Sequence, residues 1–581
     1  MLSYRKLAMR VLGRPLNTGG GINSSRPASQ RAAAFILTAA MLTTLAAPAF
    51  AETWYIENGD ITVKASGTEG KNTVSQGNKK DVEDTNTIIT NQNKDTASSN
   101  TVTIEAKDKD DKVEVTLKDV NIDTSNRNKA AVSVTGSGNT TIKLDGDNHL
   151  TGGNGIYSNS SGSLTISGDE NDSLTAQGGD SRNGIYSVSG DVTISGGTVT
   201  ATGGNSTGSY GSGGDGIHSG SLTISGGTVT ATGGGSTGSN GLGGRGIYSV
   251  SGDVTISGGT VTANGGNSTG SYGSGGDGIS SSSGVAVSGG TVTANGGNGG
   301  NVSGDGIRSD GGVTISGGTV KAAGGDSKDG YGGDGIRSGG GVTISGNTVN
   351  AAGGNGGKVG GYGICSFDRV AISGGTVEAA GGSSGSSNGG SGIYSSVIDL
   401  SGSLELTAKA GSPNGKALSQ KGSELVLDTI KDKLGPGAKV TATDADGKVI
   451  DQVPIPRPVE PEKPVIPEES SSSSDGGSAA PSAPAFSLPG LTVTDKDGQR
   501  ISYTSTQSGN TLTVCVGRLT ASFRISLAAL RQLRAEGIET ITFQTILCST
   551  TLSLDELLAM GGEDAEAVLT HRFTDSSLTV G

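Results

Sequence analysis

The sequence predicts an all-β fold, a right-handed parallel β-helix solenoid, on the basis of three observations. A Gly-Ile pair recurs every 28 to 32 residues, and such a period is typical of stacked coils. Within each repeat, apolar residues alternate with Ser and Thr, which is the pattern of strands. The chain has 105 Gly and only 3% aromatic residues, which disfavours a conventional globular core, but the glycines are periodic. The pairs begin at Gly155, Gly184, Gly216, Gly246, Gly278, Gly306, Gly335, Gly363 and Gly392.

The repeat 184–204, GIYSVSGDVTISGGTVTATGG, contains three short strand patterns. Its alternating apolar residues are Ile185, Val192, Ile194, Val199 and Ala201. If each strand pairs with its copy in the next repeat, every coil adds about 4.8 Å to the solenoid. The crossover rule predicts the right-handed winding.

Two glycine pairs, Gly196-Gly197 and Gly203-Gly204, separate the strands. We expect turns with positive φ at both, because glycine adopts such angles without steric cost. One coil buries about five aliphatic side chains at roughly 1.5–3 kcal/mol each, against about 1–2 kcal/mol of ordering cost for every residue. A coil therefore needs neighbours on both sides, and the two ends need caps.

The composition changes along the chain and divides it into six parts. These are a signal peptide (1–51), an N-terminal cap with the first irregular coils (52–150), the regular β-helix repeats of about 29 residues (151–411), a C-terminal cap (412–451), a Pro/Ser-rich linker (452–487) and a small α+β domain (488–581). In the last part, Ser526 is placed to cap a helix that carries Leu527, Leu530 and Leu533 on one face. Nothing in its sequence identifies a partner for this domain.

The N-terminal segment has the features of an export signal. Basic residues precede an apolar run, AAAFILTAAMLTTLAA, and an Ala-Phe-Ala site predicts cleavage before Glu52. The alternative is a membrane anchor, for which the apolar run is short. Removing this segment, with six basic and no acidic residues, changes the net charge from −13 to −19. We therefore expect a secreted or cell-surface protein with no nucleic-acid partner and no stable membrane insertion.

The three cysteines are too few for a disulfide scaffold. Cys515 and Cys548 both lie in strand-like runs of the last domain, and the sequence leaves open whether they pair. Cys365 follows a Gly-Ile pair in an outward strand position, which predicts a surface thiol.

Scarce aromatic residues collect beside the Gly-Ile pairs and provide the first candidate site. The candidate carbohydrate-binding residues are Tyr157, Tyr186, His218, Tyr248 and Tyr394. Stacked coils would line these rings up, and flat rings suit the apolar faces of sugars. The alternative is that Tyr occupies outward strand positions because of its β-propensity.

Acidic residues recur directly before the Gly-Ile pairs, so in stacked coils they would form a file, that is, a line of equivalent residues along the solenoid. Its members are Asp215, Asp277, Asp305 and Asp334, and Arg245 interrupts it. Carboxylates one coil apart are within range of a shared calcium ion, with Asp277, Asp305 and Asp334 as candidate ligands. With Arg308 and Arg337 they also form an Asp/Arg mixture of the kind used to cleave polysaccharides, but the array repeats these groups and shows no unique pocket. Asp in Gly-rich segments is also a common turn former.

One stretch supports a family resemblance. The segment 101–158, TVTIEAKDKDDKVEVTLKDVNIDTSNRNKAAVSVTGSGNTTIKLDGDNHLTGGNGIYS, is followed by repeats of LTISGGTVTATGG. It resembles exported bacterial right-handed parallel β-helix proteins described as carbohydrate-binding-domain-containing proteins, which are similar in fold to pectate lyases. The resemblance covers about residues 54–450. It implies the fold, and it brings no catalytic signature.

Taken together, these patterns favour an exported, non-catalytic, adhesin-like surface protein, whose β-helix stalk binds a glycan or a cell-wall or host-surface polymer. No cofactor is expected, apart from the possible calcium ion. Two alternatives remain open at this point: a polysaccharide lyase or glycoside hydrolase on the same fold, and a purely structural stalk.

Overall fold

The computed structural model describes residues 52–68, 70–456 and 491–580, the last range with gaps at 496–498, 502, 509, 517–519, 546–548, 561–564 and 572–575. The chain divides into two compact units, 1–461 and 462–581, which are described separately. The predicted signal peptide and all but the first residues of the predicted linker lie outside the described residues. Among the described residues, no helix has the length and apolar character needed to cross a membrane.

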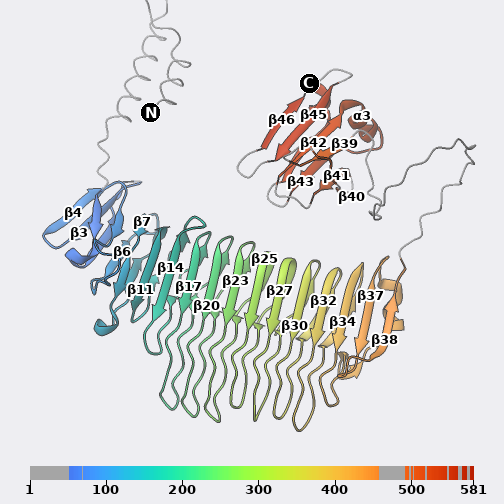
Figure 1. The fold of residues 1–581 in the computed structure, drawn as a ribbon, viewed down its shortest axis with the longest axis horizontal. Coiled ribbons are helices and arrows are strands. Elements are labelled where there is room, and N and C mark those ends of the chain that lie inside the picture. Colours follow the sequence, from blue (N-terminus) through green and yellow to red (C-terminus); the bar gives the residue numbers. More distant parts are fainter. Residues whose placement is uncertain are drawn as a thin grey trace, which may run out of the picture. The chain divides into compact units, whose positions relative to one another are not determined.

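The first unit is a parallel β-solenoid of about 14 turns, as expected from the repeats (Figure 1). Each regular coil contributes one strand to each of three columns. The first column contains β2 (Ile61–Ala65), β6 (Val102–Ala106), β9 (Val132–Gly136), β12 (Ile156–Ser160), β15 (Ile185–Ser187), β18 (Ile217–Ser219), β21 (Ile247–Ser249), β24 (Ile279–Ser281), β26 (Ile307–Ser309), β28 (Ile336–Ser338) and β35 (Leu418–Gln420). The second contains β1 (Thr53–Tyr55), β5 (Ile88–Thr90), β7 (Lys112–Lys118), β10 (Asn139–Asp145), β13 (Leu164–Ser167), β16 (Val192–Ile194), β19 (Leu222–Ile224), β22 (Val254–Ile256) and β29 (Val342–Ile344).

The third column contains β8 (Asn121–Asp123), β11 (Asp147–Gly152), β14 (Ser173–Gly178), β17 (Thr198–Thr202), β20 (Thr228–Thr232), β23 (Thr260–Asn264), β30 (Thr348–Ala352), β32 (Gly375–Ala380), β34 (Leu404–Lys409) and β37 (Lys439–Thr443). Four longer strands run from one column into the next. They are β25 (Val285–Asn295), β27 (Val313–Ala323), β31 (Ile364–Ile372) and β33 (Ile393–Leu400).

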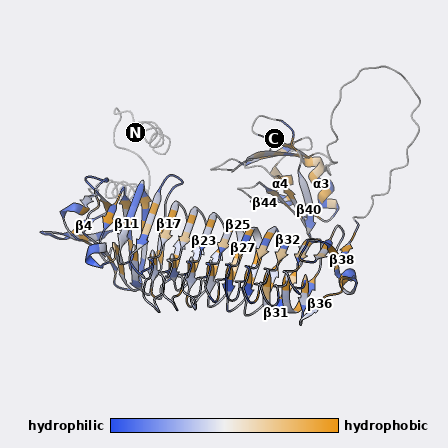
Figure 2. Ribbon diagram, turned by 60° about the horizontal axis from the view of Figure 1, so that its bottom comes forward, coloured by the Kyte–Doolittle hydropathy of each residue, from blue (hydrophilic) through white to orange (hydrophobic). Residues whose placement is uncertain are grey.

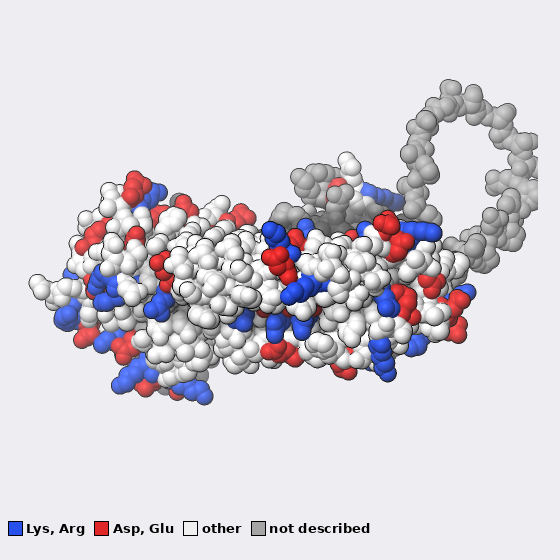
Figure 3. Space-filling view, turned by 90° about the horizontal axis from the view of Figure 1, so that it is seen from below, with Lys and Arg blue, Asp and Glu red and all other residues white. Residues whose placement is uncertain are grey.

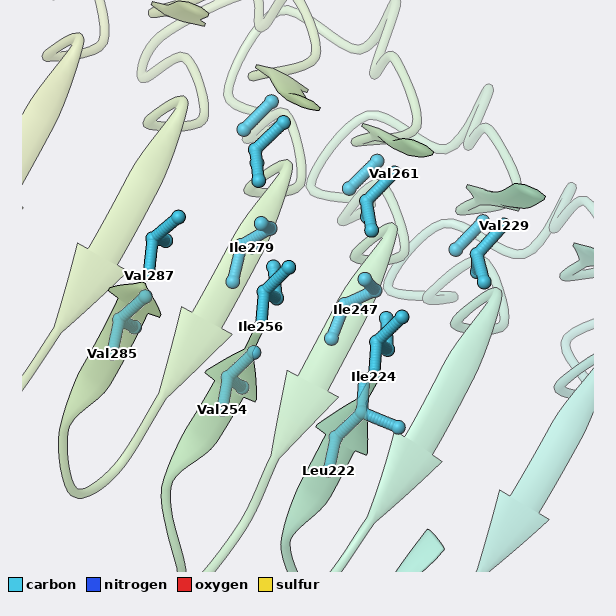
Figure 4. Close-up of a cluster of buried hydrophobic side chains, with 14 of the residues drawn as sticks. Leu222, Ile224, Val229, Ile247, Val254, Ile256, Val261, Ile279, Val285 and Val287 are labelled. Atoms are coloured by element: carbon cyan, nitrogen blue, oxygen red, sulfur yellow. The ribbon is translucent and has the colours of Figure 1, made fainter. Parts of the chain in front are cut away.

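Equivalent residues of successive coils pair with one another. Ile185 is in register with Ile217 and Ile217 with Ile247, while Thr198 pairs with Thr228. The aliphatic residues point into one interior, where they are almost fully buried (Figure 4). Hydrophobic and more polar residues accordingly alternate along the strands (Figure 2). The predicted stacking of like residues on like is confirmed.

The interior also contains a file of serines that the apolar pattern did not predict. The third residue of the short strands β15, β18, β21, β24, β26 and β28 is a buried serine, such as Ser187 and Ser249. Their hydroxyl groups donate to carbonyl oxygens of the following turn, Ser187 Oγ to Gly190 O at 2.8 Å and Ser249 Oγ to Gly252 O at 2.7 Å. A buried hydroxyl group is tolerated where it is hydrogen-bonded, whereas the hydroxyl group of Ser219, in the same file, has no partner among the described residues.

The two glycine pairs of the repeat play different roles. Gly197 has φ +75°, as predicted for a turn. Gly203 and Gly204 are not among the residues with positive φ, so the prediction for this pair is wrong. They are needed for close approach instead, because a Cβ atom at Gly203 would lie 1.9 Å from Gly214 O, and one at Gly204 would lie 1.7 Å from Gly179 O.

These glycines belong to the loops that leave the third column and return to the first, which lie side by side along one edge of the solenoid (Figure 1). Gly214 N donates to Gly204 O, Gly234 N to Gly214 O and Gly244 N to Gly234 O, each at 2.8 Å. The pattern continues through later coils, so a chain of backbone hydrogen bonds connects the loops. Such close packing of two chain segments is possible only without side chains.

Antiparallel strands cover both ends of the solenoid. At the N-terminal end, β2 pairs with β3 (Asn72–Gln76), which pairs with β4 (Lys79–Asp84). At the C-terminal end, β35 pairs with β36 (Ser423–Glu424) and β37 with β38 (Val449–Pro454). The part of this unit that the structure describes also contains three short 3₁₀ helices: Ile56–Asn58, Ser125–Arg127 and Leu427–Lys433. The caps limit pairing of the end coils with other chains. Parallel pairing already begins within 52–150.

The described residues of the second unit form two four-stranded sheets and two helices. One sheet has the order β39 (Leu491–Thr494), β42 (Ala521–Ser526), β45 (Glu566–His571), β46 (Ser576–Val580), and the other β40 (Thr504–Ser508), β41 (Thr511–Cys515), β43 (Thr540–Gln544), β44 (Ser549–Ser553). The helices are α3 (Leu527–Ala535) and α4 (Leu554–Met560). Ser526 Oγ accepts a hydrogen bond from Ala529 N at 3.2 Å, so Ser526 caps α3 as predicted. Cys515 is a free cysteine, and Cys548 lies outside the described residues.

Candidate functional site: a groove along the solenoid

Three rows of residues run along the solenoid beside the first column. The strand row contains the outward residues that follow the Gly-Ile pairs: Tyr157, Tyr186, His218, Tyr248, Ser280, Arg308, Arg337, Cys365 and Tyr394. The floor row contains the residues directly before those pairs: Asn154, Asn183, Asp215, Arg245, Asp277, Asp305, Asp334, Tyr362 and Ser391. The loop row contains residues of the returning loops that bridge from coil to coil: Ser212, Leu242, Ser274, Val302, Tyr331 and Val359.

The floor row is a ladder of side-chain to backbone hydrogen bonds. Asn154 Oδ1 accepts from Asn183 N at 2.9 Å, and Asn183 Oδ1 accepts from Asp215 N at 2.6 Å. Further along, Asp305 Oδ1 accepts from Asp334 N at 2.7 Å. The acidic file found in the sequence therefore satisfies backbone N–H groups of the next coil, a role that needs an Asn or Asp oxygen.

A groove runs over the floor row in the middle of the solenoid. Its volume is about 730 Å³, and it is lined by the loop row, by the floor row from Asp215 to Tyr362, and by Arg308 and Arg337. Six successive coils contribute to it, which corresponds to about 24 Å at about 4.8 Å per coil. Sequence analysis did not predict this groove, because the loop row bears no chemical signature in the sequence.

A second cavity, of about 480 Å³, lies over the same rows toward the N-terminal end. Its lining includes Lys129, Asn154 and Arg182, together with the two tyrosines Tyr157 and Tyr186.

Four of the five candidate aromatic residues come together, but they do not form a flat platform. The ring centroids of Tyr157 and Tyr186 are 5.7 Å apart with the planes 51° apart. His218 contacts Tyr186 and Tyr248 edge to face, at 4.7 and 5.0 Å. Tyr394 lies apart from them in the strand row, and its ring stacks on Tyr362 at 4.9 Å.

Opposite charges pair within the central groove. Arg337 Nη1 lies 3.3 Å from Asp334 Oδ2, and Arg245 Nε lies 3.7 Å from Asp277 Oδ2. Beside the groove, in the strand row, His218 Nδ1 lies within hydrogen-bond distance of Asp215 Oδ2, at 2.7 Å. On the face shown in Figure 3, charged side chains gather in a band near the middle of the solenoid and toward both ends, with uncharged surface between them.

Burial changes the protonation of two floor carboxyl groups. Burial raises the pKa of Asp334 to about 6, although the N–H of Tyr362 and the Arg337 guanidinium oppose the change. Burial also raises the pKa of Asp305 well above its usual value, and the negative charges of Asp334 and Asp277 add to this increase. Neighbouring carboxyl groups such as those of Asp305 and Asp334 resist simultaneous ionisation, because their negative charges repel each other.

The calcium proposal concerns these same residues, Asp277, Asp305 and Asp334. Each uses one carboxylate oxygen in the floor ladder. Among the described residues, no group of three or more His, Cys, Asp or Glu side chains is arranged to hold a metal ion.

The structure corrects the expectation for Cys365 and reveals exposed aromatic residues elsewhere. Cys365 is in the strand row, but it is only 1% exposed, so it is not a surface thiol. Burial raises the pKa of its thiol. The rings of Tyr210 and Tyr272, in the loops, are 81% and 70% exposed. Their Gly-Ser-Tyr-Gly-Ser-Gly context was the available signal for loop tips.

Comparison of the chain with models of protein families, with curated proteins and with solved structures finds no match.

Proposed function

We propose that the solenoid binds an extended glycan in the groove over the floor row. The observation that carries this proposal is the length of the groove, because six coils contribute equivalent residues and a polymer can occupy equivalent positions in succession. This is the surface-binding function expected from the sequence, with the ligand held in a groove and not on a flat aromatic strip.

The groove lining supports a sugar ligand. The side chains of Ser303, Asp334 and Arg337 supply donors and acceptors for hydroxyl groups. Tyr331 and Val302 supply apolar surface on the loop side. Carbohydrate recognition commonly combines such polar groups with an aromatic face.

Binding to immobilised polysaccharides and glycans tests the proposal. The double variant Arg308→Gln/Tyr331→Ala changes two partly exposed side chains of the groove and should weaken binding at least about tenfold. Thr262→Ala, on an outward position of the third column, is the control and should bind normally. Unchanged affinity of the double variant would place the ligand elsewhere, and no binding by the unmodified protein would refute glycan binding.

Cleavage of a polysaccharide is the second candidate function. The raised pKa of Asp334 and of Asp305 favours it, because a general acid must keep its proton near neutral pH. Arg308 and Arg337 line the groove beside them. Release of new reducing ends or unsaturated products, abolished in Asp334→Asn, would establish this activity, whereas binding without product would support the first function.

The remaining proposals concern the molecule outside the groove. We propose that the chain is exported and acts at the cell surface or after secretion, that the solenoid winds in the right-handed sense, and that residues 488–581 form an α+β interaction domain. A calcium ion at Asp277, Asp305 and Asp334 also stays a proposal, and calorimetric titration with Ca²⁺ tests it.

A further inference from the structure

We propose that the cavity at the N-terminal end of the floor row binds an anionic group carried by a sugar, that is, a carboxylate or a sulfate. This inference rests on the proposed glycan-binding function. It assigns the ligand chemistry at one end of the rows, where the cavity of about 480 Å³ lies over Asn154.

A hydrogen bond to the next coil sets the orientation of the Asn154 amide. Its Oδ1 accepts the hydrogen bond from Asn183 N, so the other atom of the amide must be Nδ2, a donor. Asn154 is only 9% exposed, it lines the cavity, and its Nδ2 has no hydrogen-bond partner among the described residues. This donor is not sealed from solvent, since it is not among the fully buried polar atoms that lack a partner, so it is open to an acceptor of a ligand in the cavity.

Two cationic side chains lie in the same cavity lining as this amide. Lys129 and Arg182 both line the cavity, and within the described part of the chain neither forms an ion pair. The backbone places both of them beside Asn154. Gly153 N donates to Lys129 O at 2.6 Å, and Arg182 directly precedes the Asn183 whose N–H is held by Asn154.

The described lining of this cavity contains no acidic residue, whereas the central groove has four Asp residues. The difference arises in the floor row itself. Asn and Asp both offer an oxygen to the next coil, but the second atom is an N–H₂ donor in Asn and a negatively charged acceptor in Asp. Beyond Asn183 the floor positions are Asp residues interrupted by Arg245, so the N–H₂ donor is replaced by a second carboxyl oxygen wherever Asp takes the place of Asn.

Two tyrosines in the same lining favour a sugar as the molecule that carries the anionic group. Tyr157 and Tyr186 form part of the same lining, and their tilted rings present apolar surface next to the two cations. A sugar ring packed on tyrosine with its acidic substituent directed to Lys129 and Arg182 would use both features. A free inorganic anion would use only the cations.

The experiment measures binding of three probes to the full protein by isothermal titration calorimetry. The probes are oligogalacturonate, a heparin-derived oligosaccharide and a neutral dextran oligosaccharide, of similar length. We expect at least about tenfold tighter binding of one or both anionic probes than of dextran, with affinity that falls as salt increases. A preference between the first two probes distinguishes a carboxylate from a sulfate ligand.

Two variants localise the site. Asn154→Asp keeps the oxygen that accepts from Asn183 N but replaces the N–H₂ donor. The double variant Lys129→Gln/Arg182→Gln removes the two cations. Each change should weaken the binding of the anionic probe at least about tenfold. Asn183→Asp, outside this cavity lining, is the control for the fold and should have a smaller effect. Lys328→Gln removes one charge elsewhere on the solenoid and should have almost none.

The outcomes separate the inference from the proposed function. If dextran and the anionic probes bind equally, or if Asn154→Asp and the double variant bind the anionic probes normally, the inference is wrong while glycan binding stands. If none of the probes and none of the immobilised polysaccharides and glycans binds, both the inference and the proposed function fail. Equal binding of inorganic sulfate and the sulfated oligosaccharide would show that no sugar is recognised, which also contradicts the inference.

Discussion

At the level of single residues, the loop glycines are required by the lack of space and not by their dihedral angles. Gly244 illustrates this, because its N–H donates to Gly234 O at 2.8 Å, its carbonyl accepts from Gly266 N at 2.7 Å, and a Cβ atom would lie 2.0 Å from Gly214 O. A Cβ atom at Gly208 would instead meet its nearest neighbour at 3.6 Å, an ordinary contact.

This contrast predicts different effects of two equivalent substitutions. Gly244→Ala should destabilise the protein by at least about 2 kcal/mol, because the loops must separate to admit the methyl group. Gly208→Ala, in the same kind of loop, should change stability by less than about 0.5 kcal/mol. Thermal unfolding followed by circular dichroism measures both. Equal melting temperatures for the two variants would show that the loops are not closely packed in solution.

At the level of elements, the floor row joins neighbouring coils and also holds carboxyl groups that do not ionise together. The folded-state pKa of Asp334, about 6, lies above its unfolded value, and that of Asp305 is also raised. Protonation therefore favours the folded state. The stabilising contribution is complete below about pH 4 and is lost as the pH rises through the folded pKa values.

Asp305→Asn should reveal this contribution. Asn retains the oxygen that accepts from Asp334 N, and it removes a buried carboxyl group that resists ionisation, so the variant should be more stable than the parent at pH 8. At pH 4 the difference should disappear. Denaturant unfolding at both pH values provides the measurement, and a pH-independent difference would argue against protonation of Asp305.

A carboxyl group with the opposite shift is the control for this prediction. Asp253 accepts from Ser283 Oγ at 2.6 Å and from Gly284 N at 2.7 Å, which lowers its pKa. Its ionised form favours folding, and that contribution is lost as the pH falls through the folded pKa. Asp253→Asn should therefore destabilise the protein slightly at pH 8, the opposite sign from Asp305→Asn.

At the level of the whole molecule, the solenoid is a series of interchangeable coils between two caps. β15 and β21 have the same inward residues, and the strands of the coil between them pair in register with both. Stability in such an array depends on the interface between neighbours, and not on contacts between distant coils.

Deleting one complete coil, residues 217–246, should therefore leave a folded protein. Ile185 would then pair with Ile247, and the solenoid would be shorter by about 4.8 Å. Small-angle X-ray scattering measures the change in length. Deleting only 217–231 removes part of a coil, places unlike columns in contact and should abolish folding. A folded protein from both deletions would contradict register-specific stacking.

The fold was largely predictable because the pattern repeats. Inward positions such as Ile185 and Val199 recur in every coil, so each apolar residue had only one kind of neighbour, its own copy. The candidate site was less predictable. The files of Tyr157 to Tyr248 and Asp277 to Asp334 were visible, but their surroundings were not. The loop row lies only three residues before the floor row, but its residue type changes from coil to coil, so no recurring pattern marked it as the wall of a groove.

The amino-acid sequence alone determined the columns, since a period of two within strands and a period near 29 between coils leave one way to bury the aliphatic residues. Only the tertiary structure decided which outward residues share a groove, that Cys365 is buried, and that the acidic file is a hydrogen-bonded ladder. The physical reason is that burial follows from periodicity along the chain, whereas a cavity depends on how closely two glycine-rich segments pass each other in space.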